Sequence, residues 1–479
     1  MQDSKLLQLI QSLSKEELKT FGNYLEGASH RKTGSVYALY NYFKKLYPDF
    51  PEKKVKKEFV YGKIMPKGKE YNDKRIRDLM SILTLNLENF IIAKELEDNE
   101  PERELILLNA LKKRKQDKLF FQKVKQLERK WEKNPPKGII KYHYEYLLQK
   151  EYYMHPNLSL YEEKPSTLHN VIEKMDHYYF ASKLYYEVIN LHNQNDLNRE
   201  GKSKNILIKH INQTITKEEF KHNPHINIFS HFFQAYTTEN PLNIESLEKI
   251  YINLFPFFND TEKHDLFIIL QGMYYFNYNK GKKEYIFNVF ELCKFALEKN
   301  IIIENNIIAN DMFRNIIGVT CMVQKFEWGY QFIEKYQKYL DDNGKNDIVS
   351  LCEATMAFYE TKFNTCLEKL LTVKIQDTLY GIQVRILQMQ CYYELENYEE
   401  AFYNLAHSFA TYLHRNSTIS VGLQKQNLNF IHVTKKLHKA KENSTQISSS
   451  FVEEIQKNKN IMNKKWLIKK AVELQVLTK

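Results

Sequence analysis

A short pattern, an aromatic residue followed three positions later by a small one, recurs in the second half of the chain. It occurs at Phe326-x-x-Gly329, Phe363-x-x-Cys366 and Tyr398-x-x-Ala401, whose aromatic residues are separated by 37 and 35 positions. Repeats of about 20–50 residues are typical of proteins in which each unit buries its apolar face against the next one. We therefore expect an array of stacked units, which is a surface suited to holding another molecule.

The composition favours helices as the repeated elements. The 479-residue chain contains only 14 Gly and 11 Pro, fewer than the ~7% and ~5% typical of soluble proteins. Few turn-forming residues indicate few tight turns, so long helices fit the chain and a many-stranded sheet does not. Hydrophobic residues make up 43% of the chain, with 33 Tyr and 29 Phe, which is enough material for a core. We expect an all-α fold.

Two polar segments indicate domain boundaries. The run Asn134-Pro135-Pro136-Lys137-Gly138 is the strongest helix stop in the chain, and the Ser-rich run from Glu442 to Ser450 is typical of an exposed linker. We expect a basic N-terminal helical domain over residues 1–134, a solenoid over 139–440, a linker over 441–450 and a basic C-terminal helix over 451–479.

The repeat pattern extends to a third position. A larger apolar residue, Ile333, Leu370 or Leu405, follows each small residue by four positions. In these features the chain resembles the tetratricopeptide repeat family, most clearly over residues 310–415, and as a whole it is similar to long all-helical bacterial proteins without an assigned activity. The resemblance implies a right-handed solenoid of helix pairs. An irregular helical bundle with one chance match to the pattern is the alternative.

The same resemblance implies a groove lined by the first helix of each pair. The groove positions that it indicates are Arg314, Thr355, Tyr359, Gln390, Tyr393 and Glu394. This set has only one arginine, whereas a groove that grips a terminal carboxylate needs several basic residues. A mixed apolar and aromatic groove suits an amphipathic helix or an extended segment. Ordinary packing between repeats is the alternative role for each of these residues.

Charge is unevenly distributed along the chain. The net charge is +11 for residues 1–150, −8 for 151–422 and +8 for 423–479. Basic clusters in the first segment are candidate contacts to nucleic-acid phosphates. These residues are Lys53, Lys54, Lys56, Lys57, Lys74, Arg75, Arg77, Lys112, Lys113, Arg114 and Lys115. Acidic residues are interleaved with them, so a solvated or partner-docking surface is the alternative.

Motifs for catalysis or metal binding are weak. Gly201-Lys202-Ser203 lacks the glycine five residues earlier that a phosphate-binding loop requires, and His222 and His225 flank a proline turn without a spaced set of further ligands. The five cysteines form no CxxC pair and lie in apolar helical patterns, which favours buried thiols in the cytoplasm. We expect neither a membrane span nor a metal or cofactor.

The leading hypothesis is therefore a non-enzymatic scaffold or adaptor that binds a protein or peptide along the solenoid groove. The alternative is a nucleic-acid-associated regulator that contacts phosphates through its basic N-terminal region.

Overall fold

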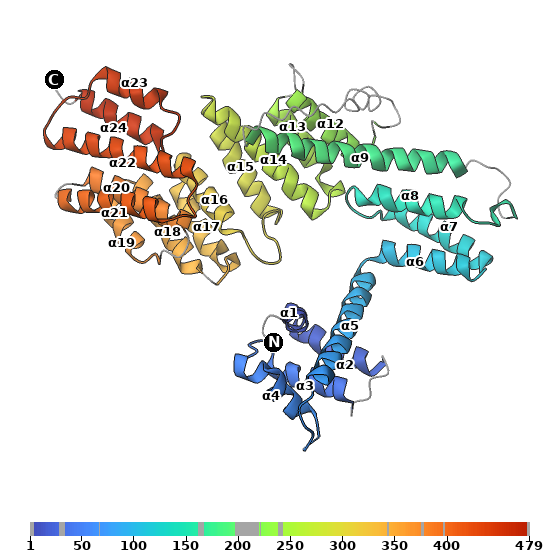
Figure 1. The fold of residues 1–479 in the computed structure, drawn as a ribbon. Helices are drawn as coiled ribbons and strands as arrows, with labels where there is room; N and C mark the ends of the chain where they lie inside the picture. The colour runs from blue at the N-terminus through green and yellow to red at the C-terminus, as the bar shows by residue number, and fades with distance from the viewer. Residues whose placement is uncertain are drawn as a thin grey trace. The chain divides into compact units, whose positions relative to one another are not determined.

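The computed structural model describes residues 4–476 except 28–33, 67, 161–166, 197–219, 221, 238–242, 343, 375–377 and 396–397. The described residues form 22 α-helices (Figure 1), and their only β-type pairing is one isolated bridge between Glu304 and Ile307. The chain divides into two compact units, Met1–Ser182 and Lys183–Lys479. No helix in the described ranges is long and apolar enough to cross a membrane.

The first part of unit 1 is a small helical core. Its helices are α1 (Lys5–Ser12), α2 (Lys15–Gly27), α3 (Ser35–Leu46), α4 (Lys57–Ile64) and α5 (Asp73–Asp98), with a 3-10 turn at Glu52–Val55. The start of α2 is fixed by a reciprocal cap, because the Ser14 hydroxyl accepts from the Glu17 amide and the Glu17 carboxylate accepts from the Ser14 amide. Phe21, Phe43 and Leu83 are fully buried where these helices meet.

A second core in unit 1 joins α6 (Glu100–Lys113), α7 (Asp117–Lys133) and α8 (Ile140–Tyr153). The predicted stop at 134–138 does separate α7 from α8. However, Trp131 before it and Tyr144 after it belong to one hydrophobic core, so the compact unit continues beyond residue 134. Helix α9 (Thr167–Asp196) begins in unit 1 and ends in unit 2.

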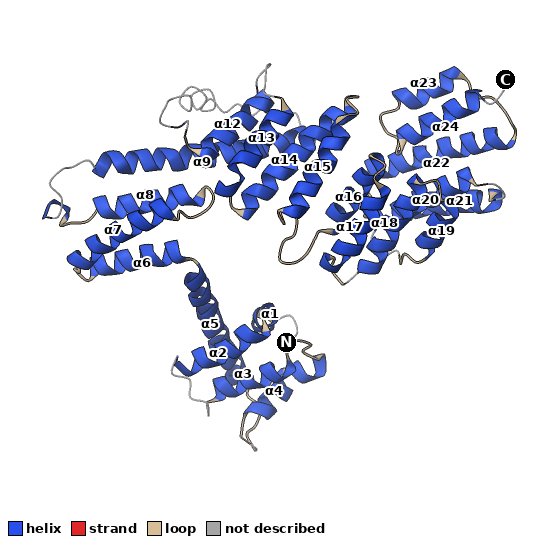
Figure 2. Cartoon of the chain, turned by 180° about the vertical axis from the view of Figure 1, so that it is seen from behind, coloured by secondary structure: helices blue, strands red, loops and turns tan. Residues whose placement is uncertain are grey.

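Unit 2 is built from consecutive packed helices (Figure 2). They are α12 (Pro224–Thr237), α13 (Ile244–Leu254), α14 (Asp260–Asn279), α15 (Tyr285–Glu298), α16 (Asn310–Met322), α17 (Phe326–Tyr336), α18 (Lys345–Tyr359), α19 (Phe363–Leu371), α20 (Thr378–Glu394) and α21 (Glu399–Arg415). The all-α, helical-hairpin repeat fold expected from the sequence is confirmed.

The repeated pattern marks the start of the second helix in three pairs. Phe326 and Phe363 are the first residues of α17 and α19, and Tyr398 is the N-cap of α21. The small residues Gly329 and Cys366 are buried where the second helix approaches its neighbours. Ala401, the small residue of the third pair, is only partly buried, so the pattern coincides with the helix start in all three pairs and with close packing in two.

The C-terminal segment differs from the expected single helix. After α22 (Val421–Glu442) the chain forms α23 (Ser449–Lys457) and α24 (Lys464–Val476). Helix α23 ends at Asn458, whose side-chain oxygen accepts a hydrogen bond from the Asn460 amide at 2.8 Å, a local turn that competes with helix continuation. The two helices then fold back on each other and join the core formed by α20, α21 and α22.

Candidate functional site

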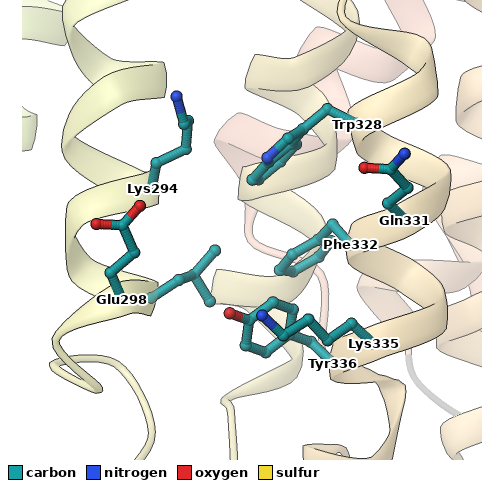
Figure 3. A pocket seen from close by; sticks show the side chains of 8 residues that line it. Lys294, Glu298, Trp328, Gln331, Phe332, Lys335 and Tyr336 are labelled. Atoms are coloured by element: carbon teal, nitrogen blue, oxygen red, sulfur yellow. The ribbon is translucent and has the colours of Figure 1, made fainter.

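An aromatic pocket lies between α15 and α17 (Figure 3). Trp328, Phe332 and Tyr336 occupy successive turns of α17, and their rings stack with centroid separations of 5.5 and 5.3 Å. Residues four positions apart lie on one face of a helix, so the sequence of α17 alone places all three rings along one edge of the pocket. We call this site the α15–α17 pocket.

Contacts from neighbouring helices hold the rings in place. Phe332 is buried, and its ring centroid lies 4.6 Å from that of Phe313 on α16. Trp328 meets Phe290 on α15 edge to face at 4.9 Å. The pocket wall is therefore fixed by packing before any ligand arrives.

The rim of the pocket carries both signs of charge. Lys294 and Glu298 extend from α15, and Gln331 and Lys335 extend from α17. The Lys294 ammonium is 2.9 Å from Glu291, whereas Lys335 lies 5.0 Å from the centroid of the Tyr336 ring. Since Lys294 already has a carboxylate partner, Lys335 is the cation on this rim that is better placed to contact an incoming acidic group.

The size of the pocket limits what it can hold. Its volume is about 190 Å³, below the ~300–1,000 Å³ of typical small-molecule sites. This volume matches that of a single side chain inserted by a partner. The described residues contain no group of three or more His, Cys, Asp or Glu side chains placed to hold a metal ion.

The structure uses part of the predicted groove internally. Gln390 and Tyr393 are each only 3% exposed. The Glu394 carboxylate accepts a hydrogen bond from the Trp466 indole at 3.3 Å and lies 2.8 Å from the Lys470 ammonium. Because α24 covers these α20 residues, Tyr393 and Glu394 are internal contacts in this conformation.

The other three predicted groove residues differ in accessibility. Arg314 lies 4.6 Å from the Tyr380 ring centroid, pairs with Asp311 and donates a hydrogen bond to Gln383. The Thr355 hydroxyl donates to the Leu351 carbonyl of its own helix at 2.8 Å. Tyr359 alone presents a large exposed surface, with 49% of it accessible.

The basic residues predicted as phosphate contacts fall into two places in unit 1. Lys57 and Arg77 both pair with Asp73, at 3.2 and 2.8 Å, so the groups around residues 53–57 and 74–77 are neighbours. Lys53, Lys54, Lys56, Lys74 and Arg75 are exposed around them. Hydrogen bonds from Tyr71 and Lys57 hold the pKa of Asp73 below its usual value, so the carboxylate stays charged and partly neutralises this surface.

The third basic group, Lys112, Lys113, Arg114 and Lys115, lies at the C-terminal end of α6. Lys112 pairs with Glu151 on α8. The Arg114 guanidinium donates to the Ala110 carbonyl of its own helix at 3.1 Å. Lys113, Arg114 and Lys115 are exposed, whereas Lys112 is partly buried.

The cysteines and one of the two predicted histidines lie in the protein interior, whereas His222 is exposed. All five cysteines are buried thiols, and burial raises the pKa of Cys293 to about 12, which opposes nucleophilic chemistry at neutral pH. The His225 ring lies 3.2 Å from Glu262, and both side chains are buried. Gly201-Lys202-Ser203 lies outside the described residues.

The α15–α17 pocket was not foreseen from the sequence, although the spacing of Trp328, Phe332 and Tyr336 was a usable signal. Its second wall comes from α15, a helix outside the three clearest repeats. No protein-family model, curated protein or solved structure matches this chain.

Proposed function

We propose that this protein is a non-enzymatic scaffold or adaptor that binds a segment of another protein, with the α15–α17 pocket as the anchor point. The observation that carries the proposal is the aromatic wall of Trp328, Phe332 and Tyr336 in a pocket of about 190 Å³. Binding energy at protein interfaces concentrates where a few aromatic or arginine side chains fill such pockets. The pocket size favours one partner side chain over a metabolite.

The surrounding fold supports the same proposal. Consecutive helix pairs expose long faces on which a bound segment can continue beyond its anchor. Tyr359, at the end of α18, is half exposed and is a candidate secondary contact. We further propose that the array belongs to the tetratricopeptide-like solenoids, on the strength of the aromatic-x-x-small pattern at the start of α17, α19 and α21.

We also propose that the protein works in the cytoplasm. The support for this location is that all five cysteines are buried and none is paired in a disulfide. Unpaired thiols are typical of a reducing compartment.

The test is an affinity capture from native cell extract with matched variants. Gln331→Trp places a bulky ring at the exposed rim and fills the pocket, while Trp328→Ala removes one wall. Phe287→Ala is the control, because Phe287 is an exposed aromatic residue on α15 that does not line the pocket. We expect a stoichiometric protein partner that both pocket variants lose and the control retains.

Each extract is divided, and one half is treated with nuclease. Recovery that requires intact nucleic acid would reject the protein-binding proposal in favour of the basic N-terminal surface. Equal capture by wild type, Gln331→Trp and Trp328→Ala would reject the α15–α17 pocket as the anchor. Circular dichroism of each variant checks that loss of capture does not reflect unfolding.

A further inference from the structure

A second concave surface lies in unit 1, where α1, α4 and α5 meet. It is a cleft of about 400 Å³, which is within the size range of sites that bind ligands. We call it the α1–α5 cleft. The residues that line it include Lys5, Lys57, Arg77, Met80, Leu85 and the acidic Glu88.

The floor of the cleft is apolar although it faces solvent. Leu85 is 58% exposed, and Met80 beside it is half buried. At this exposure Leu85 contributes little to the hydrophobic core of unit 1. Burying such a side chain fully is worth about 1.5–3 kcal/mol, and a partner that covers the cleft would gain part of this free energy.

Cations surround this floor. Lys5 is 2.5 Å from Glu88, and Lys57 and Arg77 share the single carboxylate of Asp73. Three cations therefore face two acids. The Lys5 and Arg77 side chains remain 71% and 61% exposed, so both can accept a further anionic partner.

A hydrogen-bond donor completes the polar edge. The Ser4 hydroxyl is shielded from solvent and has no hydrogen-bond partner among the described residues. It is the N-cap residue of α1, yet its side chain makes no capping bond. A buried hydroxyl without a partner is unfavourable.

We propose that the α1–α5 cleft is a second docking surface, which takes an acidic amphipathic helix from a partner protein. The apolar side of such a helix would cover Met80 and Leu85, and its carboxylates would contact Lys5 and Arg77. With the α15–α17 pocket in unit 2, this surface makes the protein a two-site adaptor. The cleft proposal stands on unit 1 alone and does not depend on the pocket.

A nucleic acid fits this surface less well. Phosphates and sugars would lie against Leu85 without burying it in an apolar environment. A nucleic-acid surface needs a cationic stripe that follows a backbone, whereas here the cations line the cleft together with Met80, Leu85 and the acidic Glu88.

The test uses the full-length chain and a synthetic 18-residue helical peptide with Leu at i, i+3 and i+4 spacing and Glu at the outward positions. A matched peptide carries Lys in place of Glu. Fluorescence anisotropy measures binding of each. We expect saturable binding of the acidic peptide only, weakened by added salt because the charges are exposed.

Two substitutions on α5 locate the site. Leu85→Asp places a charge on the cleft floor, and Ile92→Asp is its control, because Ile92 lies on the same helix, is 57% exposed and does not line the cleft. Leu85→Asp and Arg77→Glu should each weaken binding of the acidic peptide at least about tenfold, equivalent to about 1.4 kcal/mol, while Ile92→Asp leaves it unchanged.

Three results would overturn the proposal. They are the absence of acidic-peptide binding to the wild-type chain, equal binding by the Leu85→Asp and Ile92→Asp variants, and displacement of the peptide by a short DNA duplex whose own affinity is unaffected by Leu85→Asp. The last result would assign the rim to nucleic acid. Because Leu85 and Arg77 are exposed, the variants are expected to fold, and thermal unfolding checks this.

Discussion

Gly329 shows how a single residue sets the distance between helices in unit 2. A Cβ atom at this position would lie 2.8 Å from Met356 Cε on α18 and 3.0 Å from Thr320 Cγ2 on α16. Met356 is fully buried, so the end of its side chain has little space to move. Helix α17 can pack against both neighbours because residue 329 has no side chain.

This contact leads to a prediction with an internal control. Gly329→Ala should destabilise unit 2 by about 1–3 kcal/mol, because an added methyl group overpacks a tight core. Gly318→Ala, on α16, has no atom within 4 Å of the added Cβ and should stabilise the helix by about 0.5–1 kcal/mol. Urea unfolding of both variants measures the difference. Equal midpoints would show that α17 can shift without cost.

At the scale of elements, α24 is bound to the array by charge as well as by apolar packing. Lys470 pairs with Glu394 on α20, and both side chains are less than 15% exposed. Lys465 lies 4.1 Å from the ring centroid of Tyr278 on α14. The basic C-terminal segment thus contacts the more acidic middle of the chain.

The Lys470–Glu394 pair can be tested against its neighbour in sequence. Lys470→Ala should cost about 1–3 kcal/mol, because it leaves a largely buried carboxylate without its cation. Lys469→Ala should have little effect, since Lys469 is exposed. The double variant Lys470→Met with Glu394→Gln should recover part of the loss, because it removes both charges together. Thermal unfolding compares the stability of the three variants. Equal stability of the Lys470→Ala and Lys469→Ala variants would contradict a stabilising Lys470–Glu394 pair.

These contacts also explain what could be predicted from the sequence. The helix pairs from α16 to α21 were foreseeable, because the aromatic and small residues that set each pair are close together in the chain. The covering of Glu394 by Lys470 joins residues that are far apart in sequence, and no local pattern encodes it. The two walls of the α15–α17 pocket likewise come from different helix pairs. The break between α23 and α24 falls on a segment with three asparagines, Asn458, Asn460 and Asn463, the last with a positive φ of 49°, a local signal that the expectation of one helix overlooked.

At the scale of the whole molecule, both units contain a histidine whose pKa is lowered in the folded state. Burial lowers the pKa of His155 in unit 1, with Asp117 partly opposing it, and burial lowers the pKa of His231 in unit 2. The Nδ1 atom of His231 has no hydrogen-bond partner among the described residues. In the unfolded chain these rings titrate near ~6.5.

The lowered pKa values of His155 and His231 set the sign with which the free energy of unfolding depends on pH. Well above pH 6.5 the rings of His155 and His231 are neutral in both the folded and the unfolded chain, and these two histidines contribute no pH dependence. As the pH falls below that value, the unfolded chain binds protons before the folded chain does, so the free energy of unfolding decreases. We expect the thermal unfolding midpoint to fall from pH 7.5 to about pH 5.5, where ordinary carboxyl groups still remain mostly charged.

A pair of histidine variants on either side of the start of α12 isolates this effect. His231→Gln removes a partly buried ring and should reduce the loss of stability on acidification, whatever its effect at pH 7.5. His222→Gln, at an exposed position, should leave the pH dependence unchanged. The decisive quantity is the difference in unfolding midpoint between the two pH values for each variant. If His231→Gln and His222→Gln show the same difference as the wild-type chain, protonation of His231 does not contribute to acid destabilisation, and the lowered pKa assigned to its partly buried ring is wrong.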